Sequence, residues 1–286
     1  MDEEWRGTFE IFQAPRFGEI YAMHTGRRRI WVGDLQGFFS SRPLFGNTTL
    51  YIHNLLDSTE NCASAITACA RELRVARVWV SAVRENPHFR RGRVSLLYTA
   101  VMDLKKSEEI LWQHIGAKTR NMIRRGEKEE LKILPAISDR VFSDWWKVYE
   151  QTAKSKEFTL QPRALVHAVF KEDALAKLFV ARKGTETIGG MFFFTHDYPV
   201  YWLGGFERAS NYHASHINLW KAMLYFKKNG YAILDLGGVE TDESHGPSRF
   251  KRAFNGDLKT SWMYRIPINT PKAFIFDLAA SLYNRN

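Results

Sequence analysis

Short apolar runs alternate along the chain with longer stretches whose apolar residues recur at helical spacing. Runs rich in β-branched and aromatic residues predict strands, whereas recurrence at every third or fourth position predicts amphipathic helices. The predicted strands are residues 9–13, 19–24, 29–33, 49–54, 75–82, 95–104, 178–182, 189–196, 200–206, 232–236 and 261–267. The predicted helices are residues 58–74, a stretch that begins at Ser107, and residues 138–154, 162–174, 215–229 and 271–283.

The order of these elements predicts an α/β (α+β) protein of two domains. Twice along the chain a series of strands is followed by a helix and a further strand, which is typical of mixed, mostly antiparallel sheets. This order fits acetyltransferase-like (GNAT) folds and does not fit a doubly wound sheet. No G-x-G-x-x-G or G-x-x-x-x-G-K-S/T motif indicates a dinucleotide or P-loop site. We expect acetyltransferase-like domains at residues 1–130 and 131–286, the second with the terminal helix.

Composition excludes several other classes of protein. A length of 286 residues suggests two domains, and 45% hydrophobic residues argue against disorder. No apolar run approaches the ~20 residues that span a bilayer, so we expect no stable membrane insertion. Residues 1–7 are acidic and polar, without the pattern of a secretory signal. Cys62 and Cys69 would lie about 10 Å apart on a helix, too far for a disulfide. We therefore expect a cytoplasmic protein.

The formal net charge of +10 favours phosphate-rich partners. Much of this charge lies in residues 118–128. If this segment is a helix, spacings of three, four and three residues place four polar and basic side chains in one stripe along its surface, and two arginines form a neighbouring stripe. Only Glu127 offers local pairing, so this face either binds an anionic partner such as RNA or is simply solvated. The first stripe is Lys118, Asn121, Arg125 and Lys128, the second is Arg120 and Arg124, and a separate cluster is Arg27, Arg28 and Arg29.

Paired glycines follow the predicted strand 232–236. Gly237 and Gly238 permit a positive φ or the close approach of a ligand or another backbone, which makes them candidate substrate-binding residues. After a polar loop, Pro247 suits the first turn of a helix and Gly256 suits its end.

Lys251 lies on this predicted helix. Phe250 and Phe254, four residues apart, are expected to anchor one helix face in the core, and Lys251 then projects from a neighbouring face near the helix N-terminus. A cation there opposes the helix dipole, which indicates a use other than stability. A lysine and helix N–H groups directed at one point would stabilise an oxyanion. The alternative is an ordinary surface lysine.

Several segments resemble the Fem-type transferases, which use aminoacyl-tRNA to build branch peptides on peptidoglycan precursors. Leu-Asp-Leu-Gly-Gly at 234–238 and Phe-Lys-Arg-Ala-Phe-Asn-Gly at 250–256 look like the end of that family. Residues 12–18 look like its opening, with Phe17 in place of a tryptophan. Three further segments are similar and stand in the same order: 118–125 resembles the basic helix at the domain join, and 215–220 with 231–238 resembles the late helix and strand.

The resemblance implies transfer of an amino acid from aminoacyl-tRNA to the amine of a small peptide or nucleotide-linked peptide, with no cofactor and no metal. The acceptor would be a cell-wall precursor or an intermediate of a peptide antibiotic. Phe250 and Lys251 would be catalytic, with Lys251 stabilising the oxyanion. Arg163 falls near a family arginine, and Arg27 or Arg28 would replace its phosphate-binding lysine. The implied tRNA-binding residues are Lys118, Arg120, Arg124, Arg125 and Lys128.

Two other classes of function stay open. An acyl-CoA-dependent N-acyltransferase can have this fold, but its pyrophosphate loop is glycine-rich and residues 207–216 contain no glycine. An RNA-binding module would use the basic helix and leave Lys251 without a role. His213 and His216 have a metal-like spacing but no evident third ligand. Candidate general bases are Asp34, Asp235 and His245.

Overall fold

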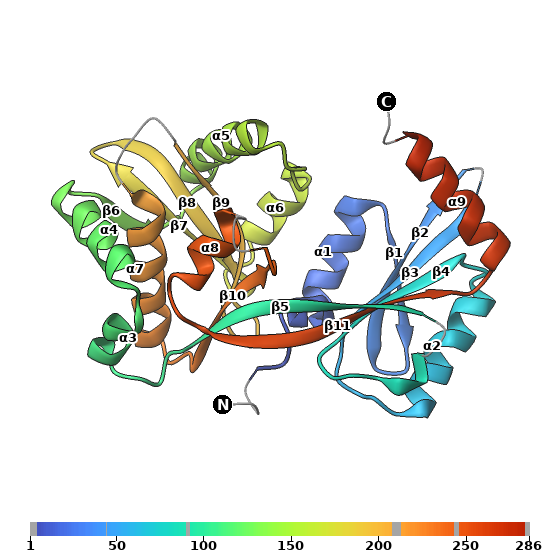
Figure 1. Cartoon of the computed structure of the whole chain (residues 1–286). Helices are drawn as coiled ribbons and strands as arrows, with labels where there is room; N and C mark the ends of the chain where they lie inside the picture. Colours follow the sequence, from blue (N-terminus) through green and yellow to red (C-terminus); the bar gives the residue numbers. More distant parts are fainter. Residues whose placement is uncertain (1–4, 44, 90–91, 208–212, 243–245, 284–286) are drawn as a thin grey trace. The chain divides into compact units, whose positions relative to one another are not determined.

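The computed structural model describes residues 5–43, 45–89, 92–207, 213–242 and 246–283. The chain divides into two compact units, each built from more than one segment (Figure 1). Strands β5 (Arg93–Asp103) and β11 (Asp257–Pro267) each begin in one unit and end in the other. Unit 1 comprises Met1–Trp5 and Tyr98–Lys259, and unit 2 comprises Arg6–Leu97 and Thr260–Asn286.

This division differs from the boundary expected at residue 130. Residues 98–130 belong with the later segment because β5 pairs antiparallel with β10 (Ile233–Val239). The last strand belongs with the early segment because β11 pairs antiparallel with β4 (Arg77–Ala82). Both pairings join residues far apart in the sequence, and local hydrophobic patterns carry no information about them.

Unit 2 contains a mixed sheet in the order β1-β2-β3-β4-β11. The first three strands are antiparallel neighbours, and β4 is parallel to β3. Helix α2 packs on this sheet, and Ile66 of the helix shares a buried cluster with Val78 and Val80 of β4. This unit includes β1 (Arg28–Val32), β2 (Leu35–Arg42), β3 (Gly46–Leu55), α2 (Glu60–Glu72), the 3-10 helix η2 (Pro87–Phe89) and α9 (Thr270–Tyr283).

The two strands predicted at the start of the chain are wrong. The 3-10 helix η1 (Glu10–Gln13) replaces the first and α1 (Pro15–Thr25) replaces the second. Phe17, Ile20 and Tyr21 are buried on α1 at spacings of three and four residues. This helical period went unrecognised in a short apolar segment, where strand and helix patterns are hard to distinguish.

Unit 1 repeats the arrangement of unit 2 with its strands in the order β5-β10-β9-β8-β7-β6. Strands β6 to β9 are antiparallel neighbours, β10 is parallel to β9, and β5 is antiparallel to β10. The prediction of two similar α/β lobes with mixed, mostly antiparallel sheets is therefore confirmed. The remaining strands are β6 (Lys132–Pro135), β7 (Ala176–Lys183), β8 (Glu186–Phe194) and β9 (Val200–Phe206).

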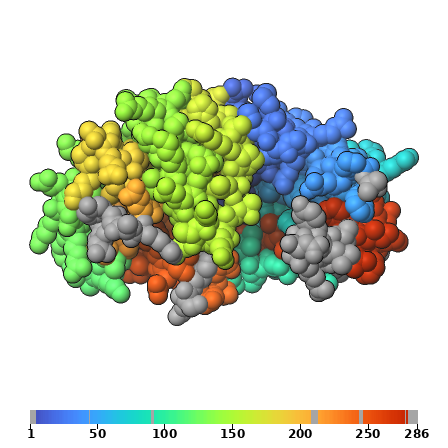
Figure 2. Space-filling view, turned by 90° about the horizontal axis from the view of Figure 1, so that it is seen from above, coloured from blue at the N-terminus to red at the C-terminus, as the bar shows by residue number. Residues whose placement is uncertain are grey.

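Helices cover both faces of the sheet in unit 1. Phe193 of β8 packs against Phe226 of α7 on one face, whereas Phe192 packs against Trp145 of α5 on the other. Figure 2 shows the residues of α5 and α6, in green and yellow-green, at the surface of this unit. The helices are α3 (Glu108–His114), α4 (Ala117–Lys128), α5 (Asp139–Lys156), α6 (Arg163–Phe170), α7 (Ala214–Lys228) and α8 (Gly246–Arg252).

The stretch predicted as one helix from Ser107 is two helices. Ser107 caps α3 as expected, and its Oγ accepts the Ile110 N–H at 3.3 Å. The chain is extended at Ile115, which ends α3 and lets α4 start in a new direction. An added Cβ at Gly126 would lie 2.9 Å from Ile217 of α7, so the glycine permits close packing of α4 on α7.

Within the part of the chain that the structure describes, each helix is too short or too polar to cross a bilayer. Cys62 and Cys69 are free and partly buried on α2. Burial raises the pKa of both thiols, which lowers their thiolate fraction at neutral pH.

Candidate active site

The parallel strands β9 and β10 of unit 1 pair over a very short stretch. Among the described residues they share one register pair, Asp235 opposite Val200, and the Asp235 N–H donates to Pro199 O at 2.9 Å. The equivalent parallel strands of unit 2, β3 and β4, stay paired from Thr49 to Leu55. Both strands continue to pair with their other neighbours, so the ladder between β9 and β10 is interrupted beyond Asp235, and this interruption is called the opening below.

Gly237 and Gly238 lie inside β10 at this opening. The strand continues through them to Val239, so the expectation that they end it is wrong. The register with β5 shifts between Asp235 and Gly238, and Gly237 has a φ of 74°. The predicted positive φ is confirmed at Gly237, because the irregularity in the strand requires a left-handed residue there.

Lys251 of α8 reaches the same opening, and α8 lies beside β10 (Figure 1). Its Nζ donates to Gly238 O at 2.8 Å and lies 5.4 Å from the centroid of the Tyr201 ring on β9. Burial lowers the pKa of Lys251 to about 8, and the carboxylates of Asp235 and Glu240 partly offset this effect. The site therefore holds a desolvated amine that is mostly protonated at neutral pH.

The expected position of Lys251 near a helix N-terminus is wrong. Helix α8 spans Gly246–Arg252, so Lys251 lies in its last turn, where the dipole favours a cation. The helix ends early because Asn255 adopts a left-handed conformation, with a φ of 56°. The backbone N–H of Asn255 donates to Arg252 O at 2.9 Å in a tight turn. The case for Lys251 therefore depends on its burial in the opening, and helix N–H groups have no part in it.

The two aromatic residues beside Lys251 differ in burial. Phe254 is fully buried as predicted, whereas Phe250 is only partly buried and packs against the same core cluster. The Phe250 ring lies 5.1 Å from the ring of His216 on α7, and burial lowers the pKa of His216 to about 4. His216 therefore packs as a neutral ring, and His213 precedes α7 in a left-handed conformation.

Asp235 is enclosed by hydrogen-bond donors. Its side chain is fully buried and accepts the Gly237 N–H at 2.7 Å, the Trp5 Nε1–H at 3.0 Å and the Thr99 hydroxyl. A carboxylate held in this way suits a structural or electrostatic role better than that of a base open to substrate. The other base candidates differ: Asp34 is exposed in a turn of unit 2, and His245 lies outside the described residues.

The basic helix α4 is confirmed as a helix, but its cations have different environments. Arg120 is partly buried, and its Nη1 donates to three carbonyls at the end of α3: Gln113 O and Ile115 O at 2.9 Å, and Trp112 O at 3.3 Å. The Arg124 guanidinium lies 5.3 Å from the Trp112 ring centroid. The exposed cations of α4 are Lys118, Arg124, Arg125 and Lys128.

The start of α4 is joined to the end of α8. The Gly116 N–H donates to Ala253 O at 3.2 Å, and Asn255 Nδ2 donates to His114 O at 2.6 Å. The segment that begins the basic helix therefore contacts the chain two residues after Lys251. The sequence gave no indication of this connection.

The remaining predicted arginines are distant from Lys251 in the sequence, and their contacts are with other residues. Arg163 begins α6 in unit 1, is exposed, and donates to Ser143 Oγ at 3.2 Å. Arg27 belongs to unit 2, where its guanidinium lies 4.2 Å from the Tyr51 ring centroid and bonds to the Tyr21 hydroxyl. Arg28, also in unit 2, lies over the Phe39 ring.

The sequence reading missed Tyr201, Thr99 and Trp5. Burial raises the pKa of the Tyr201 phenol, and its ring forms one side of the Lys251 environment. No local motif identifies these residues, because each comes from a different part of the chain and reaches the site only through the fold.

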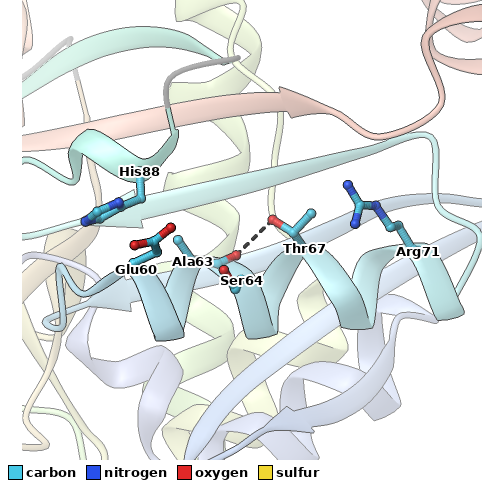
Figure 3. A pocket seen from close by; sticks show the side chains of 6 residues that line it. All are labelled: Glu60, Ala63, Ser64, Thr67, Arg71 and His88. Carbon is cyan, nitrogen blue, oxygen red and sulfur yellow. Dashed lines mark hydrogen bonds between the residues drawn. The ribbon is translucent and has the colours of Figure 1, made fainter.

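A hollow of about 580 Å³ lies along the exposed side of α2 in unit 2 (Figure 3). Glu60 and Arg71 stand near its ends, His88 faces Glu60, and small side chains lie between them. None of the predicted functional residues lines it, so the hollow and the candidate chemistry do not coincide. Its lining residues are Glu60, Ala63, Ser64, Thr67, Arg71 and His88.

Comparison with protein families places a known domain over this site. Residues 117–252, which include α4, Gly237, Gly238 and Lys251, match the family described as Acetyltransferase (GNAT) domain. The fold is that of the GNAT acyltransferases. Comparison with curated protein sequences gave no match.

Solved structures share the fold over most of the chain. FemX has a TM-score of 0.69 at 13% identity, with 90% of this chain and 92% of that chain covered. L-PGS (lysylphosphatidylglycerol synthetase) from Bacillus licheniformis has 0.66 at 14% identity, with 97% of each chain covered. A tandem GNAT protein from the clavulanic acid biosynthesis pathway has 0.53 at 10% identity, with 82% and 79% covered. At these identities the likeness shows the GNAT fold alone.

Proposed function

We propose that this protein is an aminoacyltransferase that moves an amino acid from aminoacyl-tRNA to the amine of a peptide acceptor. The observation that carries the proposal is the partly buried Lys251 side chain, whose ammonium donates to Gly238 O in the opening between β9 and β10. The acceptor is a cell-wall precursor or an intermediate of a peptide antibiotic, and the reaction takes place in the cytoplasm, where charged tRNA is made.

Lys251 acts on the ester carbonyl of the donor. The neutral acceptor amine attacks this carbonyl, and negative charge develops on its oxygen in the tetrahedral intermediate. A lysine whose pKa is about 8 carries its proton at neutral pH and donates a hydrogen bond to that oxygen. The attack forms the new C–N bond. The carbonyl then re-forms as the C–O bond to the tRNA ribose breaks, and the proton that the attacking amine loses ends on the departing ribose hydroxyl. The ammonium is partly withdrawn from water, so fewer water molecules compete with it for that oxygen than at an exposed site.

The exposed cations of α4 bind the tRNA backbone in this proposal. Lys118, Arg125 and Lys128 face solvent, and Glu127 is paired instead with Lys221 of α7 at 2.9 Å. The contact between Gly116 and Ala253 places the beginning of this helix against the segment that follows Lys251. A tRNA bound by α4 can therefore extend its aminoacylated 3′ end toward the opening. Likeness in fold to FemX and L-PGS is consistent with this donor.

The second candidate is an acyl-CoA-dependent N-acyltransferase, favoured by the match of residues 117–252 to an acetyltransferase domain. The link between β9 and α7 argues against it, because residues 207–213 contain no glycine to approach a pyrophosphate. The basic face of α4 would have no role in that reaction.

A competition between donors tests the proposal. The protein is incubated with a pool of tRNA charged with isotopically labelled amino acids, and in parallel with labelled acetyl-CoA. Each donor is offered a peptide amine, a nucleotide-linked peptide and phosphatidylglycerol, and products are identified by mass spectrometry. We expect label from tRNA on a peptide amine. Label from acetyl-CoA alone, or binding of tRNA without transfer, would refute the proposal.

A further inference from the structure

The carboxylate of Asp235 contacts the same glycine turn as Lys251. Oδ1 accepts the Gly237 N–H at 2.7 Å and the Thr99 hydroxyl, while Oδ2 accepts the Trp5 Nε1–H at 3.0 Å. The side chain is fully buried. A carboxylate that leaves water for such a site needs these donors, because burying an unpaired charge is costly.

The bond from Gly237 to Asp235 fixes the turn that Lys251 uses. It joins a side chain to the amide two residues later, which holds the backbone in a defined turn. Gly237 then has a φ of 74°, and the next carbonyl, that of Gly238, accepts from Lys251 Nζ at 2.8 Å. An added Cβ on Gly237 would lie 3.3 Å from this Nζ, which shows how closely the turn and the amine approach.

The charges around Lys251 come from several elements. Asp235 on β10 and Glu240, the residue that follows β10, contribute carboxylates, of which Asp235 is buried and Glu240 is exposed. Helix α8 itself carries the cations Arg249 and Arg252, and Arg252 donates to Glu240 O at 2.7 Å. Strand β9 contributes the neutral Tyr201 phenol, and α7 contributes the neutral His216 through its contact with Phe250. The buried anion is the least screened of these groups.

We propose that Asp235 is the positioning residue of this site. Its carboxylate holds the Gly237 turn that orients Lys251, and it provides the negative charge that keeps the buried lysine protonated. This inference rests on the proposed role of Lys251, and it predicts that Asp235 acts without touching substrate.

The test removes the charge of Asp235 while keeping the size and shape of its side chain. Asp235→Asn would direct an NH2 group at the Trp5 N–H, so it is combined with Trp5→Phe, which removes that conflict. Trp5→Phe alone is the matched control. Glu240→Gln removes the same charge from an exposed position. The neutral amine of Lys251 is followed by trace labelling with acetic anhydride from pH 6 to pH 11, with the Lys251 peptide quantified by mass spectrometry.

We expect the labelling midpoint of Lys251 to fall by about one pH unit in the double variant, as for loss of a nearby opposite charge. Trp5→Phe should leave the midpoint unchanged, and Glu240→Gln should move it less. The alkaline limb of the kcat profile should shift with the midpoint. An unchanged midpoint in the double variant would overturn the inference.

Labelling and transfer distinguish the two proposals. A shifted midpoint in a protein that transfers no amino acid would refute the aminoacyltransferase and leave the effect of Asp235 on Lys251 standing. Normal transfer with an unshifted midpoint would refute the role of Asp235 and leave the aminoacyltransferase proposal standing. If the double variant does not fold, Thr99→Val tests the turn. It keeps the charge of Asp235 and removes the hydrogen bond that the Thr99 hydroxyl donates to its carboxylate. It should lower kcat several-fold with KM and the midpoint unchanged, and an unchanged kcat would count against the inference.

Discussion

Gly237 and Gly238 are neighbours in β10 with different surroundings. A Cβ on Gly237 would lie 2.9 Å from Tyr201 O and 3.3 Å from Lys251 Nζ, whereas a Cβ on Gly238 would meet nothing within 4 Å. Gly237→Ala should therefore lower the free energy of unfolding by roughly 2–3 kcal/mol, through left-handed strain and the backbone contact. It should also reduce kcat. Urea unfolding and transfer kinetics measure both effects.

Gly238→Ala is the matched control for this substitution. It should change the unfolding free energy by less than about 1 kcal/mol, because its space is open. Equal effects of the two alanines would contradict the geometry described for the turn.

The shifted pKa of Lys251 also predicts how stability depends on pH. The pKa falls from 10.5 in the unfolded chain to about 8 in the folded protein, so below pH 8 both states are protonated and burial of the charge costs roughly 3 kcal/mol. Between pH 8 and 10.5 the folded state loses its proton first, and this cost disappears. Urea unfolding at several pH values should show Lys251→Met more stable than the native protein at pH 7. That advantage should shrink toward pH 10, and a difference independent of pH would contradict the shift.

Sequence could identify Lys251 but not the reason for its importance. The position of Pro247 suggested a helix long enough to put Lys251 near its N-terminus, whereas α8 ends at Arg252. The actual environment depends on Tyr201 and Asp235, which the fold brings from other strands. Those contacts have no local signature in the chain.

At the scale of elements, the cations of α4 separate into structural and exposed ones. Arg120 donates to three carbonyls at the C-terminus of α3, where the last carbonyls of a helix have no partner within the helix. Arg120→Ala should therefore cost about 1–3 kcal/mol of stability, measured as a lower midpoint of thermal unfolding. This result would also explain any loss of tRNA binding in that variant as an indirect effect.

Arg125→Ala is the matched exposed variant on the same helix. It should leave thermal unfolding unchanged and weaken tRNA binding, with the slope of log K against log salt reduced by about one counterion's contribution. Binding is measured by filter retention over a range of salt concentrations. A salt slope equal to that of the native protein would mean that this face of α4 is only solvated.

The local pattern of apolar residues predicted most helices and strands, and it failed where the apolar segment was short. Residues 138–154, 162–174 and 215–229 were recognised because their helical periods extend over several turns. Helix α1 was mistaken for a strand because Phe17, Ile20 and Tyr21 lie within little more than one turn. The break at Ile115 was also missed, because an extended residue between two helices leaves the apolar spacing nearly intact.

At the scale of the whole molecule, each unit is completed by a strand from a distant segment. Strand β5 pairs with β10 in unit 1, and β11 pairs with β4 in unit 2. A fragment cut at the boundary expected from sequence, residues 131–286, would leave β10 without β5 and α7 without α4. We expect this fragment to be degraded rapidly in limited proteolysis.

The fragment 98–259 is the comparison, because it keeps both partners within unit 1. It should retain a cooperative unfolding transition and resist the protease longer. Greater resistance of 131–286 would contradict the division into units. Sequence predicted the two similar lobes correctly, but strand exchange between distant segments leaves no trace in local hydrophobicity.

The central claim is that Lys251 stabilises the charge that develops during aminoacyl transfer. The most direct measurement is kcat for Lys251→Ala with saturating charged tRNA, together with the Kd for that tRNA. We expect kcat to fall by about 10²–10³-fold with Kd nearly unchanged, because the negative charge exists only in the transition state and intermediate. Lys251→Arg should restore only part of the rate, since a planar guanidinium cannot replace a compact ammonium. A near-normal kcat for Lys251→Ala would contradict the account.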